Sequence, residues 1–137
     1  MYIAFPYCNF KCDREAGCCI CQNSQLARES EIDISPIEIV SRYVKNPITK
    51  AVVFSGLEPF DSWKDLCDLI KEFRKFTDDE IIIFTGYNGD EIAKQTYWLG
   101  NEYKNIIVKF GRFVPDQEKK YDELLGIELA SPNQYAR

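Results

Sequence analysis

Four short runs of β-branched and aromatic residues stand out along the chain, separated by longer and more polar stretches. They are MYIAF (1–5), KAVVFS (50–55), EIIIFT (80–85) and NIIVKF (105–110). Runs of this length predict β-strands, and three of them are almost continuously apolar. Continuous apolar strands are typical of a parallel sheet that is buried on both faces. The pattern therefore predicts four strands of a parallel sheet.

Three segments between these runs have the start signals or the apolar spacing of helices. The first begins with a capping box, Ser35 to Glu38, and has Pro36 at the first helical position, where a missing N–H costs nothing. We expect Asp61 or Ser62 to cap the second helix. Its apolar residues recur at helical spacing at Trp63, Leu66, Leu69, Ile70, Phe73 and Phe76. In the third and weaker segment, Asn88 followed by Glu91 repeats the capping pattern.

The alternation of strands and helices predicts an α/β domain with parallel strands and right-handed crossovers. We expect one domain over residues 1–137, because no repeat, low-complexity tract or linker divides the chain. Ligands of such folds bind at the carboxyl ends of the strands. The four strands lead there into the cysteine-rich stretch and into SGLEPF (55–60), TGYNGDE (85–91) and GRFVPD (111–116). These loops together predict one shared site.

Composition narrows the classes of function. The net charge is −5 and no basic stripe is present, which argues against a nucleic-acid-binding surface. No apolar run approaches the roughly 20 residues of a membrane span. The N-terminus has no basic segment followed by a cleavable apolar one, so we expect no signal peptide and a cytoplasmic location. In a reducing cytoplasm, dense cysteines more often bind metal or carry out redox chemistry than form disulfides.

Five of the six cysteines lie within fourteen positions, at Cys8, Cys12, Cys18, Cys19 and Cys21. A zinc site would pair Cys8 with Cys12 and Cys18 with Cys21, although the residues between the pairs are few for a zinc ribbon and the chain has no histidine. A disulfide framework is the second alternative. The third is an iron–sulfur cluster, which is held by thiolates and keeps one iron open if only three cysteines bind it. Cys67, on the apolar face of the second helix, is interpreted as a small core residue.

Several motifs in the same order resemble one family. CNFKC followed by ICQN, then FSGLEPF, FTGYNGDEI, GRFVPD and ASPNQYA, resemble the motifs of radical S-adenosylmethionine enzymes, and most closely those of activating proteins of anaerobic ribonucleoside-triphosphate reductases. The similarity covers essentially the whole chain. Two departures stand out: eight residues separate Cys12 from Cys21 where the family has two, and Leu57 replaces the second glycine of the SGG(D/E)P loop. Cys18 and Cys19 lie in the resulting insertion of six residues and are alternative ligands to Cys21.

The resemblance implies a cofactor site and a fold. It implies that Cys8, Cys12 and Cys21 hold a [4Fe–4S] cluster whose open iron binds the amino and carboxylate groups of S-adenosylmethionine. It further implies that Ile20, Cys21 and Gln22 lie near the adenine. Ser55, Gly56, Leu57 and Glu58 would meet the methionyl ammonium, and Thr85 would add a polar contact. The alternative for Glu58 is that its charge stabilises the next helix. The expected fold is a small, open, partial (β/α) barrel with a mainly parallel sheet and the cluster loop after the first strand.

The family's substrate is a glycine Cα–H in a partner enzyme. The implied partners are therefore the large subunit of an anaerobic ribonucleotide reductase and an electron donor such as flavodoxin or ferredoxin. Asn133 and Gln134 of the SPNQ run are interpreted as closing the site, as binding the partner or as a surface tail. Two other functions stay open at this point: radical chemistry on another substrate, and a non-catalytic, zinc-binding cysteine-rich module.

Overall fold

The four apolar runs form parallel strands of one sheet, in the order of the sequence. The computed structural model describes residues 1–137, and its sheet has the order β1-β2-β3-β4-β7. The parallel strands are β1 (Tyr2–Phe5), β2 (Ala51–Gly56), β3 (Glu80–Phe84) and β4 (Ile106–Phe110). The α/β class and the mainly parallel sheet are thus confirmed. The sheet is open, and the curvature of a barrel stays a prediction.

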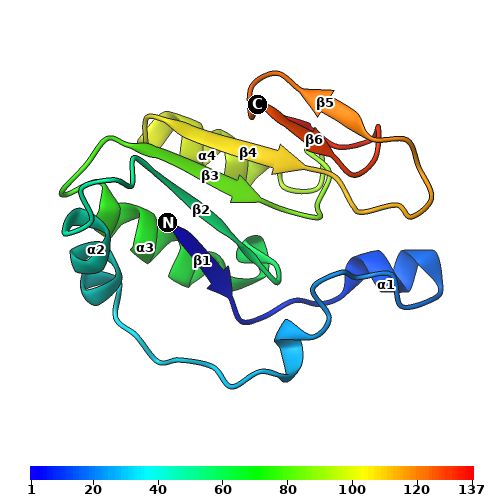
Figure 1. Cartoon of the computed structure of the whole chain (residues 1–137), viewed down its shortest axis with the longest axis horizontal. Coiled ribbons are helices and arrows are strands. Elements are labelled where there is room, and N and C mark those ends of the chain that lie inside the picture. Colours follow the sequence, from blue (N-terminus) through cyan, green and yellow to red (C-terminus); the bar gives the residue numbers. More distant parts are fainter.

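The helices between the strands begin and end close to where the apolar spacing predicted. They are α2 (Pro36–Val44), α3 (Trp63–Phe73) and α4 (Ala93–Glu102), with a short α1 (Lys11–Ala16) in the cysteine loop and 3-10 turns η1 (Leu26–Arg28) and η2 (Pro59–Ser62). Right-handed crossovers between sequentially ordered strands bring α2, α3 and α4 to the same face of the sheet, as Figure 1 shows. No helix combines the length and apolar character that a membrane span requires.

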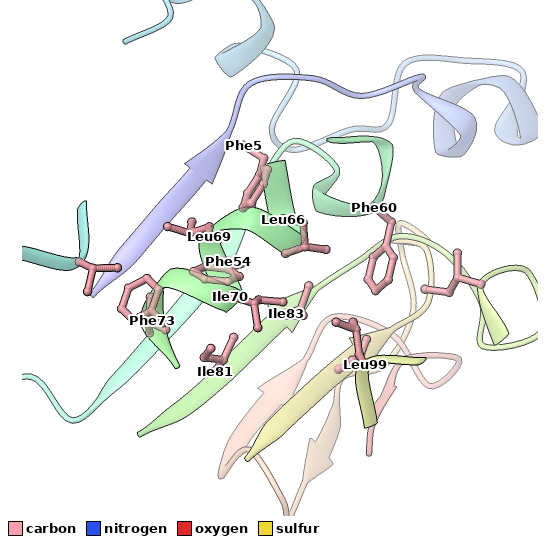
Figure 2. Packing of buried hydrophobic residues seen from close by; sticks show 14 of the residues in the cluster. Phe5, Phe54, Phe60, Leu66, Leu69, Ile70, Phe73, Ile81, Ile83 and Leu99 are labelled. Carbon is pink, nitrogen blue, oxygen red and sulfur yellow. The ribbon is translucent and has the colours of Figure 1, made fainter. Parts of the chain in front are cut away.

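The hydrophobic core lies between that face and the helices. Phe54, Ile81 and Ile83 of the strands pack with Leu66 and Ile70 of α3, and all five side chains are fully buried (Figure 2). Burial alternates along β2 and β3, so that their other side chains are only half-buried. The prediction that both faces of the sheet are buried was therefore wrong. Because sequential winding leaves the second face without helices, that face stays accessible to the loops at its carboxyl edge.

Only one of the three predicted caps formed as expected. The Ser35 hydroxyl accepts the Glu38 N–H at 3.3 Å and starts α2. Ser62 occupies the N-cap position of α3 but its side chain makes no capping hydrogen bond, and Asp61, in the preceding η2, accepts instead from Asn9, which is distant in sequence. Asn88 and Glu91 form one half of the predicted capping pattern, because the Glu91 carboxylate accepts the Asn88 N–H at 2.8 Å, but α4 itself begins later, with Ile92 at its N-cap position. Asp61 was unavailable as a cap because Asn9, distant in sequence, donates two hydrogen bonds to its carboxylate.

Other differences concern the end of α3 and the C-terminal segment. Phe76, expected on the apolar face of α3, lies beyond the end of the helix and is 61% exposed. The chain after β4 forms three short strands that the sequence did not predict. They are the hairpin β5 (Lys120–Asp122) and β6 (Ile127–Leu129), and β7 (Tyr135–Ala136), which pairs antiparallel with β4. The SPNQ run lies directly before β7, where the side chains of Asn133 and Gln134 donate to the carbonyls of Arg112 and Gly111, so its interpretation as a surface tail was wrong.

Candidate metal centre

The four loops predicted to share a site are joined by backbone hydrogen bonds at the carboxyl edge of the sheet. Leu57 N–H donates to the Phe5 carbonyl at 3.1 Å, and Glu58 N–H donates to the Tyr7 carbonyl at 2.9 Å. On the other side, Gly111 N–H donates to the Tyr87 carbonyl at 2.9 Å. The parallel strands thus bring the cysteine loop, the SGLEP loop and the two later loops into one region, as expected.

The cysteines of the first loop differ in exposure. Cys8, Cys12 and Cys21 are half-buried, whereas Cys18 and Cys19 are exposed, and all are free thiols. Burial raises the pKa of Cys8 to about 11, although the Phe10 N–H, which donates to its sulfur at 3.2 Å, lowers it. Burial likewise raises the pKa values of Cys12 and Cys21. The three thiols are therefore protonated at neutral pH in the free protein, and binding of a metal would release protons.

Cys12 is the central thiol of the three. Its pKa is raised further by charges on Cys21 and Glu58, and that of Cys8 by charge on Cys12, so the thiols are electrostatic neighbours. Its sulfur also packs on the loop after β3, 3.1 Å from where a side chain on Gly86 would begin. No three side chains converge in a geometry that holds a metal ion, so the thiols are neighbours without forming a finished ligand set.

Helix α1, which follows Cys8 and contains Cys12, is attached to the sheet by polar contacts and buries no residue. Before the helix, Asn9 donates through its backbone N–H to Asp61 at 2.8 Å and through its side-chain amide to the Tyr87 hydroxyl at 2.6 Å. Phe10 begins the helix at φ 54°, a left-handed conformation that is uncommon for an aromatic residue. The loop after β2 and the loop after β3 therefore both position the chain between Cys8 and Cys12.

A second set of contacts ties α1 to the loops after β3 and β4. Arg112 is almost fully buried and donates through Nη1 and Nη2 to the two oxygens of Glu91, both at 2.7 Å. Nη2 also donates to Glu15 of α1 at 2.9 Å, and Lys11 forms an ion pair with Glu91. The hydrogen bonds from Arg112 are the main reason why the pKa of Glu91 falls to about 2. This network was not predicted, because nothing in the local sequence links positions 15, 91 and 112.

Glu58 is the central polar residue of the SGLEP loop. One of its oxygens accepts from the Thr85 hydroxyl at 2.8 Å and from Phe60 N–H at 3.1 Å, and the other accepts from Gly86 N–H at 2.8 Å. Burial raises its pKa to about 7 against the lowering effect of these hydrogen bonds. Glu58 caps η2, and its charge contributes to the raised pKa of Cys8, while its role in binding a cofactor stays a prediction.

The remaining predicted cofactor residues fall into two groups that lie against each other. Ile20 and Cys21 are half-buried and Gln22 is exposed. The next residue, Asn23, donates its side-chain amide to the Gly56 carbonyl at 2.7 Å and so fastens this turn to the SGLEP loop. In that loop Gly56 and Leu57 are buried and Ser55 is half-buried. Thr85 donates its hydroxyl to Glu58 and accepts the Tyr87 N–H, and its predicted contact with the cofactor stays a prediction.

Lys109 is a functional candidate that the sequence analysis missed. It is 8% exposed on β4, and its ammonium donates to the Gly111 carbonyl at 3.1 Å. Burial lowers its pKa to about 8, while Cys12 and Glu58 are the nearby charges that raise it. A lysine inside the apolar run IIVKF is the signal that could have identified it.

Cys67, interpreted from the sequence as a small core residue, is only half-buried, and burial raises its pKa to about 11.

A comparison with protein families decides among the three kinds of cysteine chemistry. The family model described as "4Fe-4S single cluster domain" matches residues 1–134. The chain belongs to this family. The match therefore indicates an iron–sulfur protein and not a zinc site or a disulfide framework. No curated protein and no solved structure matches the chain significantly. The donor set fits the cluster chemically, because five free thiols lie in one loop and three of them are half-buried.

Proposed function

We propose that the protein is a radical S-adenosylmethionine enzyme that generates a glycyl radical on an anaerobic ribonucleotide reductase. The observation that carries the proposal is the contact between the cysteine loop and the SGLEP loop. Asn23 donates to Gly56, and Glu58 N–H donates to Tyr7 between the two loops. A cluster held by the first loop would therefore lie beside the carbonyls and the carboxylate of the second, which suits the amino-acid part of the cofactor.

In this proposal Cys8, Cys12 and Cys21 bind three irons of the cluster, and the fourth iron is free for S-adenosylmethionine. The chemistry that the reduced cluster supplies is one electron for the sulfonium, so that the S–C5′ bond breaks into methionine and a 5′-deoxyadenosyl radical, which takes a hydrogen atom from a glycine Cα of the partner. The electron comes from a donor of the flavodoxin or ferredoxin class. The partial burial of the three thiols supports this assignment over Cys18 and Cys19, which are exposed.

The residues of the chain bind and orient the cofactor. The carbonyls of Ser55, Gly56 and Leu57 and the Glu58 carboxylate would be the acceptors for hydrogen bonds from the methionyl amino group. Ile20 lies against the adenine, with the backbone of Cys21 and Gln22 beside it. Thr85 acts through Glu58, because its hydroxyl donates to that carboxylate at 2.8 Å. Hydrogen bonds from the amino group to Glu58 would favour the ionised form of a group whose pKa is about 7.

The open sheet supports a macromolecular substrate. The face of the sheet opposite the helices has no layer of helices over it, and β1 is paired on one side only. A radical formed there needs to be excluded from water. A glycine-bearing loop of the reductase that inserts at the carboxyl edge would complete that enclosure. A small-molecule substrate would leave the edge open.

Electron paramagnetic resonance of the anaerobically reconstituted and reduced protein tests the chemistry. We expect a [4Fe–4S]⁺ signal that changes when S-adenosylmethionine is added. Cys8→Ser, Cys12→Ser and Cys21→Ser should each lose the signal, whereas Cys67→Ser on α3 is the matched control and should keep it. Tightly bound zinc with no cluster signal would contradict the proposal. A cluster signal that ignores S-adenosylmethionine would leave an iron–sulfur protein without radical chemistry.

A second experiment tests the partner. With the reductase large subunit, the cofactor and an electron donor, we expect a glycyl radical signal on the reductase and one 5′-deoxyadenosine per radical formed. Formation of 5′-deoxyadenosine without a radical on the reductase would favour the alternative of a radical enzyme with another substrate.

A further inference from the structure

The segment between Cys12 and Cys21 creates a choice of ligands. It contains eight residues, including Cys18 and Cys19, so three thiols stand within four positions of one another. The first part of the segment continues α1 as far as Ala16, and Gly17 then turns the chain at φ 69°. After this turn, the sulfur of one of the three cysteines must face the other two ligands, Cys8 and Cys12.

Asp13 fixes the returning chain. It follows Cys12 directly, in the first turn of α1. Its Oδ1 atom accepts the backbone N–H of Ile20 at 2.9 Å and that of Cys21 at 2.9 Å. Asp13, which directly follows Cys12, is therefore linked through one carboxylate oxygen to the backbone of Cys21. The inserted residues form a loop that is closed at its base by this contact.

A second contact fastens the chain on the other side of Cys21. The Asn23 side chain donates to the Gly56 carbonyl of the SGLEP loop at 2.7 Å. Cys21 thus lies between two fixed points, one on α1 and one on the loop after β2. Cys18 and Cys19 lie within the closed loop, outside both contacts, and are exposed to solvent.

We propose that Asp13 is a positioning residue that selects Cys21 as the third cluster ligand and excludes Cys18 and Cys19. The inference rests on the three-cysteine cluster of the proposed function. The hydrogen bonds from Ile20 and Cys21 hold the backbone so that only the Cys21 sulfur returns toward Cys12. Without them the loop opens, and the two exposed thiols reach the cluster as well.

Two substitutions of Asp13 separate geometry from charge. Asp13→Asn keeps an Oδ1 atom that can accept both N–H groups, so it should retain the wild-type cluster signal. Asp13→Ala removes the acceptor and should lower the affinity for iron by about 10- to 100-fold, the usual effect of losing a residue that orients a metal ligand. Because α1 buries no residue, the melting temperature of the metal-free protein should be the same in both variants.

The ligand itself is identified in a second background. In reconstituted Asp13→Ala, without S-adenosylmethionine, we expect a mixture of cluster signals in place of one. Adding Cys18→Ser and Cys19→Ser should reduce the mixture to the single wild-type signal. Conversely, Cys21→Ser should lose the cluster when Asp13 is present and recover part of it in the Asp13→Ala background.

Two results would overturn the inference. One is an Asp13→Ala protein with a single, unchanged signal and unchanged iron affinity. The other is an Asp13→Ala protein whose mixture of cluster signals does not become the single wild-type signal when Cys18 and Cys19 are replaced. These measurements use only the iron content and the cluster signal. If the cluster did not respond to S-adenosylmethionine, the proposed function would fail, but this test of Asp13 would still apply.

Discussion

Glu58 and Glu91, both at the carboxyl edge of the sheet, have pKa values shifted in opposite directions because the groups around each carboxylate differ. Glu91 faces the cations of Arg112 and Lys11, and its pKa is about 2. Glu58 is as well supplied with hydrogen bonds, but its donors are a hydroxyl and two backbone N–H groups, and burial raises its pKa to about 7. Glu91 is therefore a permanent charge that docks α1, whereas Glu58 can be charged or neutral near neutral pH.

The raised pKa of Glu58 makes the metal-free protein less stable as the pH increases. In the folded state the group holds its proton up to about pH 7, while in the unfolded chain it loses it near its ordinary value of 4.5. Between these values the folded state binds more protons, so the free energy of unfolding falls with rising pH, by at most about 1.4 kcal/mol per pH unit. Urea denaturation at several pH values between about 5 and about 7 measures this slope.

Glu58→Gln provides the control for that slope. Glutamine does not titrate, and the chain has no histidine to contribute in the same range. The variant should therefore show a flatter dependence of stability on pH than the wild type. Equal slopes in the two proteins would mean that Glu58 does not change its charge in this range.

At the scale of elements, the close approach of β1 and β2 sets the geometry of the SGLEP loop. Gly56 ends β2 at φ 86°, and a Cβ atom there would lie 2.7 Å from the Cα atom of Ala4 on β1. Its carbonyl is also the acceptor for Asn23. The loop can leave β2 in this direction only because the position lacks a side chain.

Gly56→Ala and Gly100→Ala form a matched pair that tests this requirement. Gly56→Ala introduces both a left-handed alanine and a clash with backbone atoms, so it should lower the free energy of unfolding by about 2 kcal/mol or more. Gly100 lies in α4 with open space around it, and the same change there should raise the free energy of unfolding by about 0.5–1 kcal/mol. Denaturant titrations of the three proteins at one pH measure both effects. A neutral Gly56→Ala would show that β1 can move away from β2.

The sequence predicted the elements whose signal is local. Strands such as EIIIFT and the cap at Ser35 were identified because the apolar run or the motif alone specifies them. Strands β5 to β7 are two or three residues long and carry too few apolar residues to stand out. The candidate site likewise has features that the sequence predicted and features that it did not. The gathering of loops at the strand ends was predictable, whereas the contacts of Asp13, Asp61 and Arg112 depend on partners distant in sequence or across an insertion.

The whole molecule has two parts of unequal burial. The core between the sheet and helices α2 to α4 contains a cluster of 16 buried hydrophobic residues. By contrast, none of residues 6–35, which include all five clustered cysteines, is buried. This segment is held by hydrogen bonds and ion pairs, each of which contributes about 0.5–1.5 kcal/mol. Its local opening should therefore require much less free energy than unfolding of the core.

Limited proteolysis tests this division of the molecule and the role of the cluster in it. In the metal-free protein, trypsin should cut first within residues 6–35, at Lys11, Arg14 or Arg28, and leave the core intact. Higher salt should speed these cuts, because it weakens the ion pairs of Arg112 and Lys11 with Glu91. The fragments are identified by mass spectrometry. Reconstitution with iron and sulfide should protect the segment, since a ligand that binds only the closed form stabilises it.

A variant in which Cys8, Cys12 and Cys21 are all replaced by serine is the control for this protection. It should be cut at the same sites as the metal-free wild type and gain nothing from iron and sulfide, while Cys67→Ser should be protected like the wild type. Equal cutting in the core and in residues 6–35 would contradict the difference in stability between the two parts. Protection that survives in the triple variant would instead place the cluster on other thiols. If both expectations hold, the cluster stabilises the closed form of its loop, because the polar contacts that hold the loop in the metal-free protein are individually weak.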